Sequence, residues 1–283
     1  MSINNFKPLI WSAQLLVAWR TALVYGGPQV VNRDYEGEIA ESGDVVKITS
    51  ISDPTISDYV PNSTVITPEE LTDAQRNLVI DQSKYWAFKV DDVDKRQAKG
   101  NVVPEAMSRA AYRLRDVTDR YLAGLYTGVV AGNNLGTIAV PANTPTAAYD
   151  SILVPLGVAL DEADVPTEGR YCVVPPWFYG RLQRDDRFID ASKSGTTEAL
   201  RNGFVGRAAN FNIMKSNNTP NPTGDDNVIQ AGVNAAISFA EQINKTEAYR
   251  PESSFSDAVK GLALYGAKLI RPDGIAIATA SQT

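Results

Sequence analysis

The stretch from about Val30 to Thr67 restricts the fold of this 283-residue chain more than any other part. It is poor in large apolar side chains, so it cannot supply the buried surface that a hydrophobic core requires. Its best strand candidate, Val45–Ile51, lies between two turn-forming sequences, and the alternation of residues 77–90 predicts a returning strand. The sequence therefore predicts a long hairpin that protrudes from a separate globular body.

The predicted hairpin has two properties of a surface that binds other chains. Its strands would present unpaired edges, which a solitary protein avoids and an assembling protein uses. It is also acidic: residues 32–58 contain seven Asp or Glu against one Arg and one Lys, whereas the whole chain has a formal charge of −6. Almost the entire net charge is therefore expected on this arm.

Residues 104–127 have the clearest periodicity in the chain and predict an amphipathic helix of about 36 Å. Arg109, Arg113 and Arg120 fall on one face of this helix together with Asp116, beside the apolar face. The apolar positions, at spacings of three and four, are Val103, Met107, Ala110, Leu114, Val117, Tyr121 and Leu125.

An acidic arm and a basic helix face in one chain suggest that these two surfaces bind each other between neighbouring copies. The alternative is that both surfaces are only solvated, and the residues alone leave this open. The subunit interface predicted in this way joins Glu36, Glu38 and Asp44 to Arg109, Arg113 and Arg120.

The rest of the chain predicts a mixed body of helices and strands. A second helix is expected at 147–163 with a kink at Pro155, followed by a buried strand at Tyr171–Val174 and a short helix after Pro176. The fold class is therefore α+β, with a core built from distant parts of the chain. Further strands, expected to pack on the long helix, are predicted at 236–243, 246–249, 259–270 and 275–279.

The sequence offers little chemistry. It has no histidine and none of the common phosphate-binding or hydrolase motifs. Its single cysteine, Cys172, lies in an apolar run and is expected to be a small core residue. Asp91, Asp92 and Asp94 would suit Mg²⁺ in a metal-dependent enzyme, but we favour the alternative of a solvated acidic turn. We therefore predict no enzyme, no catalytic residue, no cofactor and no metal.

Charge and hydropathy also restrict the partners. A pI near 4.9 argues against nucleic acid as the main partner, since affinity for phosphate comes chiefly from clustered Lys and Arg. Contact with DNA is therefore expected to be weak and nonspecific. No apolar run reaches the roughly 20 residues that span a bilayer, so no membrane partner is expected.

Seven segments carry a resemblance to a known family: NRDYEGE (32–38), GDVVKI (43–48), KVDDVDK (89–95), ALDEADVP (159–166), VVPPWF (173–178), GFVGR (203–207) and YGAKLIRP (265–272). In their order and spacing they resemble the major capsid proteins of tailed bacteriophages, from about Trp11 to Ala278. The resemblance implies the Hong Kong 97-type capsid fold. It also implies a virion protein, made in the host cytoplasm, that forms hexamers and pentamers of an icosahedral head around double-stranded DNA.

The resemblance assigns parts of the chain to the domains of that fold. It places an N-terminal arm at 1–30, an E-loop at 31–90 and an A-domain at 147–234. The P-domain, with its spine helix at 104–127, takes 91–146 and 235–283.

Partners follow from the resemblance as well. They are copies of the chain itself, a portal protein, decoration proteins and a scaffolding protein, which is expected to be separate because the arm helix is predicted to start about ten residues from Met1. The nearest alternative is an encapsulin-like nanocompartment shell, which shares the fold and encloses cargo enzymes.

Overall fold

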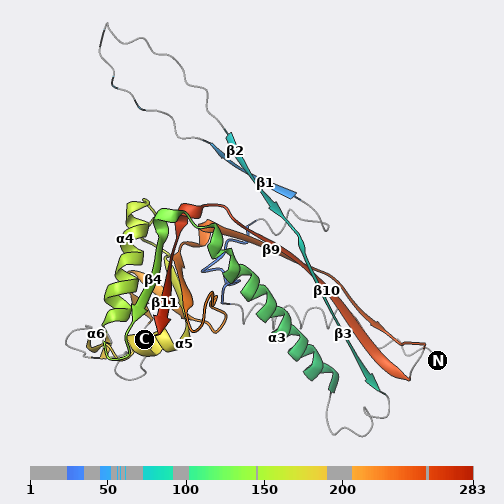
Figure 1. The fold of residues 1–283 in the computed structure, drawn as a ribbon. Coiled ribbons are helices and arrows are strands. Elements are labelled where there is room, and N and C mark those ends of the chain that lie inside the picture. Colours follow the sequence, from blue (N-terminus) through green and yellow to red (C-terminus); the bar gives the residue numbers. More distant parts are fainter. Residues whose placement is uncertain are drawn as a thin grey trace.

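The computed structural model describes residues 24–34, 45–51, 56, 58, 61, 73–91, 102–144, 146–189, 206–252 and 255–282. Over these residues the chain has the predicted α+β character, with three sheets and one long helix (Figure 1). The helices are α3 (Val102–Ala123), α4 (Val154–Glu162), α5 (Pro176–Leu182) and α6 (Asp186–Ile189). The strands are β1 (Val45–Ile51), β2 (Asp73–Val79), β3 (Gln82–Asp91), β4 (Asn134–Val140), β5 (Tyr171–Val174), β6 (Arg207–Ala208), β7 (Phe211–Lys215), β8 (Asn227–Gly232), β9 (Ile237–Tyr249), β10 (Ser256–Leu269) and β11 (Ile275–Gln282).

The largest sheet has the strand order β4-β11-β8-β5-β7-β6 and is buried on both faces at its centre. On β5, Cys172 and Val174 belong to the core on one face, and Tyr171 and Val173 to the core on the other, because successive residues of a strand alternate. All four side chains are fully buried, which explains why this strand is a continuous apolar run. Cys172 is thus a core residue, as predicted, and burial raises the pKa of its thiol.

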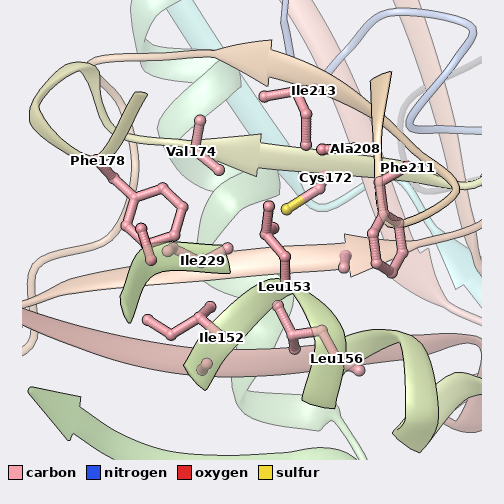
Figure 2. Packing of buried hydrophobic residues seen from close by; sticks show 14 of the residues in the cluster. Ile152, Leu153, Leu156, Cys172, Val174, Phe178, Ala208, Phe211, Ile213 and Ile229 are labelled. Atoms are coloured by element: carbon pink, nitrogen blue, oxygen red, sulfur yellow. The ribbon is translucent and has the colours of Figure 1, made fainter. Parts of the chain in front are cut away.

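Helix α4 and the turn before it cover one face of this sheet (Figure 2). Leu153 and Leu156 belong to the same buried cluster as Cys172. The kink expected at Pro155 corresponds to a π-helical turn, Tyr149–Leu153, directly before α4. Proline lacks an N–H and its ring crowds the preceding turn, so the wider π turn replaces regular α-helical hydrogen bonding there.

The long helix α3 packs on the second sheet, whose order is β3-β10-β9 (Figure 1). Met107 and Ala111 form a buried cluster with Val259 of β10, and the aromatic side chains of Trp86 and Phe88 on β3 pack against it. The two rings are stacked, with centroids 5.7 Å apart. Two of the strands that were expected to pack on the long helix are therefore β9 and β10, and β3 completes their sheet.

The helix predicted at 104–127 runs over Val102–Ala123 and continues as a 3-10 turn to Gly128. Its buried stripe is rotated from the predicted one, because Val117 is 41% exposed whereas Thr118 is fully buried. The hydroxyl of Thr118 donates to the carbonyl of Leu114 at 3.1 Å, which lets this polar residue lie in an apolar contact. A search for apolar spacing could not detect it.

Strands β1 and β2 form the predicted hairpin as a separate two-stranded sheet (Figure 1). The returning strand predicted at 77–90 is wrong in extent. The hairpin uses β2, which begins at Asp73, and the chain from Gln82 onward joins the body sheet by pairing with β10. The alternation of residues 82–90 arises because one side of β3 faces α3.

The hairpin is anchored to the body where β2 leads into β3. Leu78 and Ile80 are buried in a small cluster with Leu264 of β10. The backbone between β2 and β3 passes close to Gly266 of β10. A Cβ added to Gly266 would lie 2.3 Å from the carbonyl oxygen of Val79. Only glycine permits this approach, so the direction in which the hairpin extends from the body depends on Gly266.

Two hydrogen bonds support the same anchor. The hydroxyl of Tyr121 on α3 donates to Oδ1 of Asp81 at 3.3 Å, and Arg76 donates to the carbonyl of Leu269. Burial and the nearby Asp81 carboxylate raise the pKa of Tyr121 to about 12, so the phenol remains a donor at neutral pH. The root of the hairpin is thus tied to both the helix and the sheet beneath it.

Residues 24–34 also belong to the body, and three of their apolar side chains are fully buried. Asn32 exchanges backbone hydrogen bonds of 2.8 and 2.9 Å with β9. Arg33 forms a 2.9 Å ion pair with Glu241, so this cation of the arm is neutralised within the subunit. Asp34, the first acid of the arm, is exposed.

Strands β4, β6, β7 and β8 were not predicted. Strand β8 contains Gln230, which is buried and donates to the carbonyl of Ala123 at 2.6 Å, at the end of α3. Strands β4 and β11 fall in the ranges assigned to the P-domain, yet they share a sheet with β5, β7 and β8. The six-stranded sheet therefore takes strands from both sides of the predicted boundaries at 146 and 235.

Candidate assembly surface

The exposed side of α3 carries the three arginines that the sequence singled out. Arg109, Arg113 and Arg120 are all exposed. Arg120 Nη2 lies 3.1 Å from Asp116 Oδ2, an ion pair between residues four apart on the helix. Arg113 and Arg120 line one groove, and Arg109 lies beside Arg113 toward the start of the helix. The structure thus places the predicted arginines along one surface.

This groove, the α3 groove, lies between the helix and the loop that follows β7, and has a volume of about 380 Å³. Besides Arg113 and Arg120, it is lined by Arg115 and Lys215, which the sequence-based prediction missed. Arg115 stacks on the ring of Tyr112, with Cζ 4.1 Å from the centroid. Four cationic side chains therefore meet in one place in a chain whose overall charge is negative.

Arg115 lies on the helix predicted at 104–127, whereas Lys215 had no detectable signal in the sequence. Residues 215–218 read only as a polar turn, about 90 positions after the end of the helix, and nothing in their composition indicates a partner. The parallel pairing of β7 with β5 brings this turn beside α3. The sheet, and not local sequence, assembles the groove.

Asp119 is a buried carboxylate among the residues that line the α3 groove, with 3% of its surface exposed. Oδ2 accepts a hydrogen bond from the N–H of Val24 at 3.3 Å. Oδ1 has no partner in hydrogen-bonding geometry within the described part of the chain. Burial raises the pKa of this carboxyl, and the N–H groups of Val24 and Gly26, the side chain of Asn218 and the charge of Arg115 offset part of that rise.

Substituting Asp119 by asparagine is expected to raise the free energy of unfolding at neutral pH. The amide keeps an acceptor for the Val24 N–H and removes a buried charge. In the wild type, the contribution of Asp119 to stability is greatest below the carboxyl pKa of the unfolded chain, about pH 4, and falls as the pH rises through the higher native pKa. The advantage of Asp119→Asn should therefore grow with pH. Thermal unfolding of both proteins between pH 4 and 7 tests this, and a difference that stays constant or shrinks would contradict it.

The acidic half of the predicted interface cannot be placed. Glu36, Glu38 and Asp44 lie outside the described residues. They fall between Asp34, the last described residue before this gap, and Val45, where β1 begins. The pairing of this segment with the arginines of α3 remains a prediction.

A second exposed surface lies on the face of the β3-β10-β9 sheet that points away from α3. Tyr85, Tyr249 and Leu262 are 84%, 46% and 37% exposed on this face. They surround an ion pair of 2.9 Å between Lys260 and Glu247. Exposed apolar side chains that lie together in this way are typical of a face that another chain covers.

The metal-enzyme alternative finds no support in the described residues. Asp91 is the last residue of β3, and Asp92 and Asp94 lie outside the described part. Within that part, no three His, Cys, Asp or Glu side chains group closely enough to hold a metal ion. No helix that the structure describes has the length and apolar character needed to cross a membrane.

The fold and these surfaces define a class of protein. A hairpin on a body of two sheets, with a long spine helix across one of them, is the architecture of the Hong Kong 97-type shell. A family model described as phage capsid protein matches residues 76–278. A search of curated proteins found no match.

Solved structures agree with this assignment. A structure from Mycobacterium phage Che8 shares 32% identity over 98% of both chains, with a TM-score of 0.76. The capsid of cyanophage P-SCSP1u has 19% identity over 93% of this chain and 89% of its own, with a TM-score of 0.70. The mature capsid of bacteriophage PhiM1 has 16% identity over 85% and 82%, with a TM-score of 0.68.

The chain belongs to the phage capsid protein family. It is a major capsid protein, a structural component of the virion that forms icosahedral heads, and not an enzyme. The fold class and the function expected from the sequence are confirmed, and self-association is part of that function.

Proposed function

We propose that the chain forms hexamers and pentamers of an icosahedral shell around double-stranded DNA, and that the β1–β2 hairpin of each copy rests on a neighbour. One observation carries this proposal: β1 and β2 pair only with each other among the described strands, while the root of the hairpin is fixed by buried contacts. A two-stranded hairpin has only marginal stability alone in water. A hairpin whose root is fixed in one direction is therefore expected to rest on a partner surface.

The domain assignment is part of the same proposal, with two adjustments: the E-loop ends at 79 and not at 90, and the A-domain gains two strands. Residues 1–30 would form the N-terminal arm, 31–79 the E-loop, and α3 with the β3-β10-β9 sheet the P-domain. The six-stranded sheet with α4, α5 and α6 would form the A-domain, which then includes β4 and β11 in addition to the range 147–234. This division follows the sheets, although one buried cluster joins Tyr171 and Val173 of β5 to Phe239 of β9 and Tyr265 of β10.

Further partners are proposed from the family alone. They are a portal protein, a separate scaffolding protein and decoration proteins. Packaged DNA would be contacted weakly and nonspecifically, because the chain carries six more acidic than basic charges.

Negative-stain electron microscopy of the purified full chain, over a series of protein and salt concentrations, tests the proposal. We expect rings with sixfold and fivefold symmetry, or closed shells. Dilute monomer under every condition would overturn it.

A further inference from the structure

The α3 groove carries an excess of positive charge. Four cationic side chains and two carboxylates line it. Of the carboxylates, Asp116 is paired with Arg120 at 3.1 Å, and Asp119 is buried beneath the surface. Arg113 and Lys215 are exposed and pair with no carboxylate among the described residues. The groove therefore offers positive charge to a partner from outside the subunit.

The cations are spread along the groove and do not converge on one point. Arg113 and Arg120 lie seven residues apart on α3, about 10 Å at 1.5 Å per residue. Lys215 lies on the opposite wall, at the end of β7. A small anion would contact only part of this set, whereas a polymer with closely spaced negative charges contacts all of it. The spacing therefore favours a polyanion such as double-stranded DNA, which carries one negative charge per about 1.7 Å of its axis.

The lining of the groove distinguishes DNA from a protein partner. Apart from Val24 and Tyr112, every described residue that lines it is charged or polar, and the guanidinium of Arg115 covers the Tyr112 ring. Protein partners are held mainly by apolar and aromatic anchors in fully buried pockets. Phosphates are held by Arg, Lys and amide or hydroxyl side chains, and the exposed Asn217 supplies an amide two residues after Lys215. The chemistry of the groove therefore matches a phosphate backbone.

We propose that the α3 groove is the site at which this shell protein contacts packaged DNA, through phosphates and without reading the base sequence. The four cations of the groove contact phosphate oxygens. This inference rests on the proposed shell function and gives the weak DNA contact a defined place on the chain. Four contacts make a weak site, but mass action fills a weak site where phosphate is concentrated, as it is inside a filled head.

Binding of duplex DNA to the unassembled full chain is the first test. Fluorescence anisotropy of a labelled duplex should show an affinity that falls with salt, with a slope of about −3 to −4 in log K against log salt for four phosphate contacts. Lys215→Gln removes one contact, so it should weaken binding about fivefold at about 50 mM salt and make the slope shallower by about one. Two duplexes of different base sequence should bind alike. No binding at the lowest salt, or an unchanged slope in Lys215→Gln, would overturn the proposal.

Two further variants show whether the effect of Lys215 comes from its charge at this position. Lys215→Arg keeps the charge and should bind DNA as the wild type does. Lys268→Gln is the matched control: it removes the same charge from an exposed position on β10 that does not line the groove, and its slope should equal that of the wild type. An equal loss of affinity in Lys215→Gln and Lys268→Gln would mean that DNA responds only to the net charge of the chain, and the groove would not be a site.

Assembly, followed by electron microscopy, is a separate readout that keeps this proposal distinct from the shell proposal. Lys215→Gln should form shells as the wild type does, with the groove open to the shell interior. Loss of shells in Lys215→Gln, a groove on the outer surface of the shell, or binding of a synthetic peptide of residues 34–44 in place of DNA would overturn the proposal. A wild-type chain that binds DNA through the groove but forms no shells would contradict the shell proposal alone.

Discussion

Gly266→Ala is expected to yield a folded subunit that no longer forms shells. The new Cβ would lie 2.3 Å from the carbonyl oxygen of Val79 and 2.9 Å from Cα of Ile80, and neither backbone atom can move alone. The chain must shift where β2 leads into β3, which opens the cluster of Leu78, Ile80 and Leu264. Overpacking of this kind costs about 2–3 kcal/mol, or on the order of 5–10 °C in Tm.

The loss of assembly should exceed what lost stability explains. A hairpin with strands of seven residues turns a small change of angle at its root into a larger displacement at its far end, away from the neighbour on which we propose it rests. Gly180→Ala is the matched control, because no atom lies within 4 Å of its added Cβ and it sits inside α5. Thermal unfolding with electron microscopy of both variants decides the matter. Normal shells from Gly266→Ala would mean that the angle of the hairpin root is unimportant.

Arg170→Met is expected to destabilise the subunit by about 2–4 kcal/mol. Arg170 is 2% exposed, and its guanidinium donates to the carbonyls of Val165 and Pro166 at 2.5 and 2.9 Å. These groups tie the end of α4 to the start of β5. Methionine fills much of the volume but leaves both carbonyls without their donor.

The ion pair of Arg170 with Asp161 contributes less to this effect. Nη2 lies 2.7 Å from Oδ1, but the Asp161 side chain is 59% exposed and water replaces the lost partner. Asp161→Asn should therefore cost less than about 1 kcal/mol. Denaturant unfolding of the two variants compares the contributions, and an equal loss in both would assign the stability to charge and not to the carbonyls.

The parts of the fold that follow from local sequence were predictable. A hairpin was evident because most of the stretch from Val30 to Thr67 lacks large apolar side chains, although Val30 and Val31 at its start are buried in the body. The long helix, the strand at Tyr171–Val174 and the core role of Cys172 follow from spacing and from continuous apolar runs. In each case the pattern that decides the structure lies within one window of the chain.

Other parts depend on contacts between distant residues and gave no such pattern. Strands β7 and β8 are short and flanked by polar loops, and β8 buries Gln230 only because Ala123 offers its carbonyl. Thr118 and Asp119 look like surface residues of a helix but face the interior. The α3 groove needs both the helix and residues 215–218, which only the six-stranded sheet brings together.

A cryo-electron microscopy reconstruction of the assembled shell tests the central claim, that each copy completes the surface of its neighbours, most directly. We predict that the β1–β2 hairpin lies on an adjacent subunit. A shell in which the hairpin touches only its own subunit would contradict the claim.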